Sequence, residues 1–216
     1  TSFNIYAEFA AASLLTFCLG FITRIFQHGK WTDALGLGVF YALLVLTHLP
    51  FAIISSVCLA IYALLLWQKK DGINPFIKCV AAGIIGVSAS SFYWIGMLTE
   101  MKWLRHASEN YSSGAFDYKK GFFPFFYFRA TDTTFGSWIS DISALLTLLF
   151  LASSIFYFIY RSKNKIEVYE ERSIFRTVLP LGLFTLFMVT PLSSLVWQII
   201  TPLQKIQFPV RWLPVM

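Results

Sequence analysis

Long apolar runs, separated by short polar segments, dominate the hydrophobic pattern of this chain. Six runs can be distinguished, at about residues 5–25, 34–47, 50–67, 75–98, 139–160 and 178–200. A helix needs about 20 apolar residues to cross the hydrocarbon core of a bilayer. The pattern therefore predicts an all-α fold, a polytopic transmembrane helix bundle of about six membrane segments, some of them short or broken. We expect one transmembrane domain over residues 1–216.

The second and third runs form one apolar stretch, residues 34–67, that is interrupted at Thr47-His48-Leu49-Pro50. At about 1.5 Å per residue, an unbroken helix of this length would be far longer than the ~30 Å hydrocarbon core. Pro50 also disfavours helical conformation at the residue before it. Two short helices folded back at His48-Leu49 are therefore favoured over one kinked, tilted helix.

Lysine and arginine residues gather in the short connections on one side of the predicted bundle. They are Arg24, Lys30, Lys69, Lys70, Arg161, Lys163, Lys165, Arg172 and Arg176. Cytoplasmic loops are enriched in these residues, so this side is predicted to be cytoplasmic. It includes the loop 161–177, which is either a charged linker or a small surface helix. The polar and aromatic loop 99–138, both chain ends and the break at His48 then lie on the other side.

Composition supports a membrane class and excludes several others. Hydrophobic residues make up 57% of the chain and charged residues 13%, whereas soluble domains carry about 25% charged residues. The net charge of +6 follows from the loop cations and does not indicate nucleic-acid binding. All three cysteines lie within apolar runs, so we predict no disulfide, metal site or cofactor. The chain starts with Thr1, and we expect it to be a fragment of a longer protein.

Several ionisable and amide side chains map to the predicted non-cytoplasmic edge. They are Glu8, His48, Glu100, Asp141, Gln204, Gln207 and Arg211. A carboxylate in a membrane helix is costly unless it faces protein, water or a cation. Glu8 is therefore either an interfacial anion or a buried partner for Arg211 or a substrate cation. His48 either bonds backbone groups freed at the helix break, or takes part in proton transfer or phosphate contact.

The segment 202–212 places two prolines, two glutamines and two cations where the sixth apolar run leaves the bilayer. On a helix, Gln204, Gln207 and Arg211 would share one face, although Pro209 favours an irregular segment. Arg211 is suited to bidentate contact with a phosphate or carboxylate. The alternative is that it anchors the chain at the interface together with Trp212.

Several stretches of this sequence resemble a known family in the same order. They are Tyr6-Ala7-Glu8-Phe9, Thr47-His48-Leu49-Pro50, Phe92-Tyr93-Trp94 leading to Glu100, and the run from Leu203 to Trp212. They resemble the multi-pass membrane proteins labelled 6-pyruvoyl-tetrahydropterin synthase-related, which are similar to GT-C glycosyltransferases. The family often has an arginine just before its Ala-Glu pair, where this chain has Tyr6. Val210 replaces a usual tryptophan.

This resemblance implies a GT-C-like membrane glycosyltransferase, or a fragment of one. Its partners would be membrane lipid and a polyprenyl-phosphate-linked sugar, with the active face periplasmic or extracellular at a bacterial inner or plasma membrane. Arg211 would contact the phosphate, His48 and Gln207 would support it, and Glu8 would orient Arg211. Such enzymes place a catalytic acid in their first outer loop, expected upstream of this chain, so no catalytic residue is assigned. The alternative is a non-enzymatic lipid or polyprenol carrier, a transporter, or a scaffold subunit of an envelope-assembly complex.

Overall fold

The computed structural model describes two continuous segments, residues 2–100 and 169–200. It also describes residues 122, 145, 148, 149, 151–157, 159, 160, 203 and 212. Within this part of the chain, 92% of the residues are helical and none lies in a strand, which confirms the all-α class. The chain divides into an N-terminal unit that ends at Asn110 and a C-terminal unit that begins at Tyr111.

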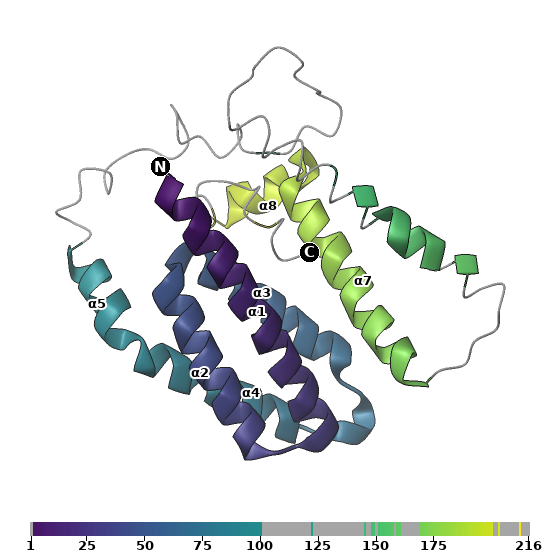
Figure 1. Ribbon diagram of the computed structural model, residues 1–216, viewed down its shortest axis with the longest axis horizontal. Helices are drawn as coiled ribbons and strands as arrows, with labels where there is room; N and C mark the ends of the chain where they lie inside the picture. The colour runs from purple at the N-terminus through teal and green to yellow at the C-terminus, as the bar shows by residue number, and fades with distance from the viewer. Residues whose placement is uncertain are drawn as a thin grey trace, which may run out of the picture. The chain divides into compact units, whose positions relative to one another are not determined.

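Five helices and one short 3-10 turn build the N-terminal unit (Figure 1). They are α1 (Ser2–His28), α2 (Trp31–Thr47), α3 (Leu49–Leu66), η1 (Lys69–Asp71), α4 (Asn74–Ala89) and α5 (Ser91–Glu100). Successive helices α1, α2 and α3 run antiparallel to one another, and α4 runs alongside α2 in the same direction. The tops of α1 and α3 therefore meet the end of α2.

The break between α2 and α3 falls at His48, as the sequence predicts. His48 adopts an extended backbone, with φ −158° and ψ 96°, and forms both the C-cap of α2 and the N-cap of α3. Its Nδ1 accepts a hydrogen bond from the backbone N–H of Phe51, at 3.1 Å. Pro50 stands in the first turn of α3, where a missing N–H costs nothing. The prediction of two helices folded back on each other is confirmed.

Tyrosine hydroxyls join helices within this unit. The Tyr41 hydroxyl on α2 lies 2.6 Å from the Ser56 hydroxyl on α3, and the Tyr62 hydroxyl on α3 lies 2.8 Å from the Thr23 hydroxyl on α1. Ser56 donates to the backbone carbonyl of Ala52, and Thr23 donates to the backbone carbonyl of Leu19. Each of these hydroxyls has one proton, so each tyrosine is the donor to its partner.

Small residues bring α2 and α4 into close contact. Gly38 and Ala42 on α2 face Ala82 and Gly86 on α4, each pair spaced by four residues. A Cβ added to Gly86 would lie 2.6 Å from the Tyr41 ring and 2.9 Å from the carbonyl oxygen of Gly38. Such small residues let helix backbones approach closely in membrane proteins. Side-chain volume at these positions therefore limits how near the two helices can lie.

The predicted segment 75–98 is not one straight helix. α4 and α5 are bent by 61° at Ser90. The Ser90 hydroxyl donates to the carbonyl of Gly86 at 2.9 Å, and the Trp94 indole donates to the carbonyl of Val87 at 3.0 Å. Side chains that bond freed carbonyls in this way are a known cause of helix bending. The apolar pattern alone carries no sign of this bend.

The C-terminal unit contains α7 (Tyr169–Val189), η6 (Pro191–Ser193) and α8 (Ser194–Ile199). α7 begins well before the predicted start at residue 178, so the charged residues of 170–176 belong to the helix and not to a linker or a separate surface helix. The predicted segment 178–200 is bent by 81° at Thr190-Pro191. The Trp197 indole donates to the carbonyl of Met188 across this bend, at 3.3 Å.

Two described helices are long and apolar enough to cross a membrane, Tyr6–His28 and Leu49–Leu66. There are up to four candidate spans if each bent pair, α4 with α5 and α7 with α8, counts as one. α2 is apolar but only 17 residues long. The structure is thus compatible with a membrane protein. Six spans stay a prediction, because the fifth run and the loop 99–138 lie largely outside the described residues.

Candidate functional site

Ionisable side chains of the N-terminal unit lie at its two opposite ends. Glu8 stands near the start of α1 and Arg24 near its end, about 24 Å apart at 1.5 Å per residue. Because α2 runs antiparallel to α1, its last residues return to Glu8 and its first turn meets Arg24. Residues far apart in the sequence therefore form one polar group at each end.

Glu8 and His48 form the first of these groups, the Glu8–His48 pair. Their side chains approach to 3.7 Å between Oε1 and Nε2, and the Glu8 side chain is 23% exposed while His48 is buried. The Nδ1 atom of His48 accepts the Phe51 N–H, so the neutral ring carries its proton on Nε2, on the side of Glu8. The structural interpretation of His48, a bond to backbone groups at the break, is confirmed.

This arrangement divides the chemistry between the two side chains. In the observed geometry His48 has no nitrogen lone pair to spare, so it can donate a hydrogen bond but cannot abstract a proton without leaving its cap. Glu8 is the group that can accept a proton or face a cation. At 3.7 Å the contact between Glu8 Oε1 and His48 Nε2 is longer than a hydrogen bond, and it brings the carboxylate next to the N–H of a neutral imidazole. The pair therefore suits a carboxylate that works beside an oriented N–H donor.

The other predicted site residues are not brought to this pair by the described structure. Glu100 is the last residue of α5 and is exposed, and no ion pair or side-chain hydrogen bond of Glu100 is seen among the described residues. Asp141, Gln204, Gln207 and Arg211 lie outside the described residues, so their assignment stays a prediction.

Trp212 is described and differs from the interfacial-anchor interpretation. Its ring is only 1% exposed and packs edge-on against Phe184, with ring centroids 5.6 Å apart. Interfacial tryptophans instead lie at the lipid headgroup level. Trp212 therefore belongs to the core of the C-terminal unit.

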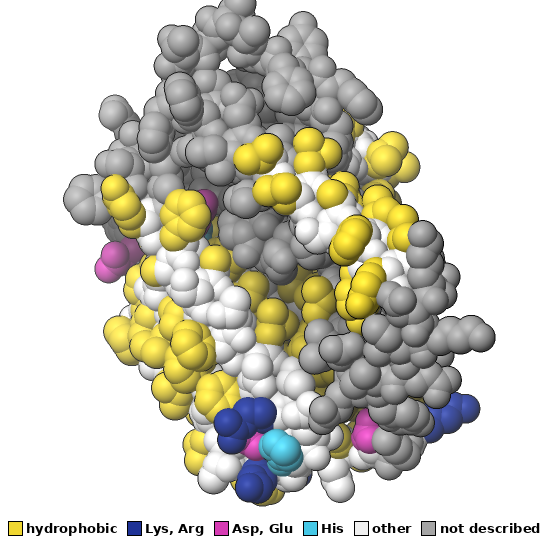
Figure 2. Space-filling view, turned by 45° about the vertical axis from the view of Figure 1, so that its right-hand side comes forward, with side chains coloured by type: hydrophobic (Ala, Val, Ile, Leu, Met, Phe, Trp, Pro, Cys, Tyr) yellow, Lys and Arg dark blue, Asp and Glu magenta, His cyan; other side chains and the backbone are white. Residues whose placement is uncertain are grey.

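The second polar group, here called the basic end, holds Arg24, Lys30, Lys69 and Lys78. Charged and histidine side chains gather there at the lower end of Figure 2, next to a wide apolar surface. Phe76 at the start of α4 contacts the rings of Phe26 and Trp67, with centroids 5.6 and 6.1 Å away, so the ends of α1, α3 and α4 meet here.

One ion pair at the basic end closes the turn between α1 and α2. Arg24 Nε donates to Asp33 Oδ1 at 2.8 Å, and the Asp33 side chain is 2% exposed. Lys78 donates to the carbonyl of Gly29 at 2.6 Å. Gly29 has φ 63°, a conformation that favours glycine. Asp33 was not predicted from the sequence, although its position just beyond a glycine turn from Arg24 is a usable signal.

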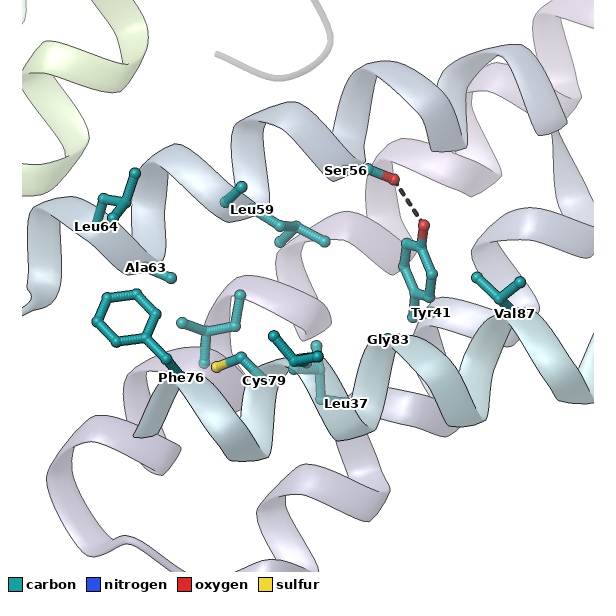
Figure 3. A pocket seen from close by; sticks show the side chains of 13 residues that line it. Leu37, Tyr41, Ser56, Leu59, Ala63, Leu64, Phe76, Cys79, Gly83 and Val87 are labelled. Carbon is teal, nitrogen blue, oxygen red and sulfur yellow. Dashed lines mark hydrogen bonds between the residues drawn. The ribbon is translucent and has the colours of Figure 1, made fainter. Parts of the chain in front are cut away.

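An apolar cavity of about 390 Å³ lies between α3 and α4, with α1 and α2 behind it (Figure 3). Its lining is Ile22, Leu37, Tyr41, Ser56, Leu59, Ala60, Ala63, Leu64, Phe76, Cys79, Val80, Gly83 and Val87. This cavity was not predicted from the sequence. A Cβ added to Gly83 in its wall would meet no atom within 4 Å, which the residue type alone does not show.

No protein family, curated protein or solved structure is found to match this chain. Among the described residues, no group of three His, Cys, Asp or Glu side chains is arranged to hold a metal ion. The described residues form an all-helical protein with apolar helices of membrane-spanning length.

Proposed function

We propose that this protein is a membrane glycosyltransferase of the GT-C kind, which uses a polyprenyl-phosphate-linked sugar at the Glu8–His48 pair. The observation that carries the proposal is the meeting of Glu8 and His48 at 3.7 Å. Both belong to stretches of the sequence that resemble this class, and they lie far apart in the chain. Their meeting creates an acid–base group at the end of the unit that lies opposite the basic end.

The distribution of cations supports a non-cytoplasmic position for this pair. Every lysine and arginine of residues 2–100 falls at helix ends or turns that make up the basic end, from Arg24 to Lys78. Lysine and arginine mark the cytoplasmic side of membrane proteins. The opposite end, with Glu8 and His48, then faces the periplasm or the exterior.

Inverting transfer needs a base, a sugar donor and stabilisation of the leaving phosphate. The Glu8 carboxylate takes the proton of the acceptor hydroxyl while the oxygen of that hydroxyl forms a bond to the anomeric carbon. The bond from that carbon to the phosphate oxygen breaks, and the electron pair leaves with the polyprenyl phosphate. His48 holds Glu8 in position through its Nε2–H. Arg211 is the predicted group for the leaving phosphate.

The test is sugar transfer by the full-length protein in proteoliposomes that contain radiolabelled polyprenyl-phosphate sugars. Glu8→Gln keeps the shape of the side chain and removes the base, so we expect kcat to fall by about 100-fold or more. His48→Asn retains an N-cap acceptor for Phe51 but removes the Nε2–H, so transfer falls while folding is kept. His48→Ala removes both functions and should lower stability as well.

Asp71→Asn is the matched control, because it neutralises a carboxylate in η1, at the opposite end of the unit, and can still accept the hydrogen bond from the Gln68 N–H. Its transfer rate should stay near that of the unmodified protein. Full transfer by Glu8→Gln would overturn the assigned base. Tight donor binding without any transfer would favour the alternative of a polyprenol carrier.

A further inference from the structure

The lining of the cavity in the N-terminal unit offers few polar groups that could bond water. Helices α3 and α4 make few direct contacts, and their side chains face each other across the gap in Figure 3. The hydroxyls in the lining belong to Tyr41 and Ser56, which bond each other at 2.6 Å, and Ser56 also donates to Ala52. Water needs two to four polar partners in a cavity, whereas apolar cavities bind apolar molecules. Hydrocarbon is therefore the suitable occupant.

The size and opening of the cavity suit one lipid chain. About 390 Å³ holds roughly a dozen methylene groups, at ~30 Å³ for a group the size of a water molecule. The lining residues Leu64 on α3 and Val80 on α4 are 62% and 61% exposed, so they form the lips of a sideways opening. With α3 across a bilayer, an opening partway along α3 and α4 is level with the hydrocarbon core.

Gly83 makes room for such a chain. A Cβ at this position would meet no atom within 4 Å. Its φ is not positive, so the helix backbone does not require glycine here. Glycine within a helix costs about 0.5–1 kcal/mol relative to alanine. The missing side chain leaves space in the wall of the cavity and gives no close helix contact in return.

The charges beside the cavity indicate the headgroup. Phe76 lines the cavity and its ring contacts that of Trp67, and Lys69 follows Trp67 by two residues at the basic end. Lys30 and Lys69 are exposed at the same end. Cations at the cytoplasmic surface attract anionic lipids by about 1 kcal/mol each. A chain in the cavity would therefore carry a negatively charged headgroup toward these side chains.

We infer that the cavity holds one acyl chain of an anionic phospholipid, with its phosphate at the basic end beside Lys69. This site is distinct from the proposed glycosyl-transfer site, which lies at the other end of the unit. Loss of sugar transfer in a Glu8 variant would leave lipid binding here unchanged.

The experiment uses the full chain in nanodiscs with phosphatidylglycerol that carries a photoactivatable diazirine on one acyl chain. Phosphatidylcholine with the same diazirine is the neutral comparison, and labelled peptides are mapped by mass spectrometry. We expect adducts on residues 76–87, with phosphatidylglycerol labelling more strongly. Lys69→Gln should reduce that preference by about fivefold and leave labelling by phosphatidylcholine unchanged.

Gly83→Leu fills the cavity and should lower labelling several-fold. Gly20→Leu is the matched control, because Gly20 is also a helical glycine with open space around it but does not line the cavity. Both variants are first compared by gel filtration and thermal melting. Equal labelling of the two variants overturns the chain site, and equal labelling by the two lipids overturns the headgroup assignment.

Other occupants are distinguishable in the same experiment. Displacement of the label by polyprenyl phosphate, but not by unlabelled phosphatidylglycerol, contradicts the phospholipid assignment. Absence of adducts on residues 76–87 in the unmodified protein means that another segment of the chain or a second copy covers the opening, and it overturns the inference.

Discussion

The two faces of α4 carry glycines for opposite reasons. Gly86 lies against α2, where an added Cβ would stand 2.6 Å from the Tyr41 ring and 2.9 Å from a backbone oxygen. Gly83, less than one turn away, faces the cavity and has no atom within 4 Å of such a Cβ. The first glycine allows two helices to touch, and the second keeps a space empty.

This difference shows that a small residue in an apolar helix has no single meaning. Small residues spaced by four allow close helix contact, which describes Ala82 and Gly86. Gly83 lies between them in the same apolar helix, and its residue type alone does not distinguish it from Gly86. Only the neighbours decide whether the missing side chain is filled by a helix or left to a ligand.

The largest expected effect is that of Gly86→Leu. The new side chain would meet the Tyr41 ring and the backbone of Gly38 and Ala42, which cannot move without separating α2 from α4. Overpacking of this kind costs about 3 kcal/mol or more. Unfolding in mixed micelles, followed by circular dichroism, measures it. Gly83→Leu is the matched comparison, and an equal loss in both variants would contradict the assignment of the two faces.

A smaller effect is expected at the basic end, where the two partners of one ion pair differ in burial. Arg24→Gln leaves the buried Asp33 carboxylate without its cation, whereas Asp33→Asn leaves a mostly exposed Arg24 that water can solvate. We expect Arg24→Gln to lower the free energy of unfolding by about 2 kcal/mol, below the 3–5 kcal/mol of a fully buried pair. The same micelle unfolding assay would refute this if Asp33→Asn proved the more damaging change.

Alanine sharpens the comparison between the two glycines. Gly83→Ala adds a methyl group into open space and should raise the free energy of unfolding by about 0.5–1 kcal/mol, the usual gain in helix preference. Gly86→Ala has the same gain in preference but must displace the Tyr41 ring, so it should lower stability. Opposite signs in parallel unfolding curves are the expected result, and two changes of the same sign would not fit the structure.

The smallest expected effects concern the hydroxyl bonds between helices. Tyr62→Phe removes the bond to Thr23, and Tyr41→Phe removes the bond to Ser56 beside the cavity. Interhelical hydrogen bonds in membrane proteins contribute about 0.6 kcal/mol on average. A double-mutant cycle of Tyr41→Phe with Ser56→Ala measures the coupling directly. A coupling near zero would show that this bond does not hold α2 and α3 together.

Much of the local structure was predictable from the chain. Apolar runs of sufficient length predict helices, and the prediction of a break at His48 is confirmed because Pro50 suits only the first turn of a helix. The separation of cations from the Glu8–His48 end also follows from the sequence. The bends at Ser90 and Thr190 were not predicted, because hydropathy does not show which carbonyls a serine or tryptophan side chain will bond.

The sequence by itself determined where helices form and where the charged residues stand along them, since both depend on neighbours within a few residues. Only the tertiary structure decided that Glu8 meets His48, that Asp33 meets Arg24, and that α3 and α4 leave a cavity. These outcomes depend on how helices cross over many residues, because side chains from several elements must fill or leave the same space. A difference as small as one glycine position on α4 then separates a packed interface from an open one.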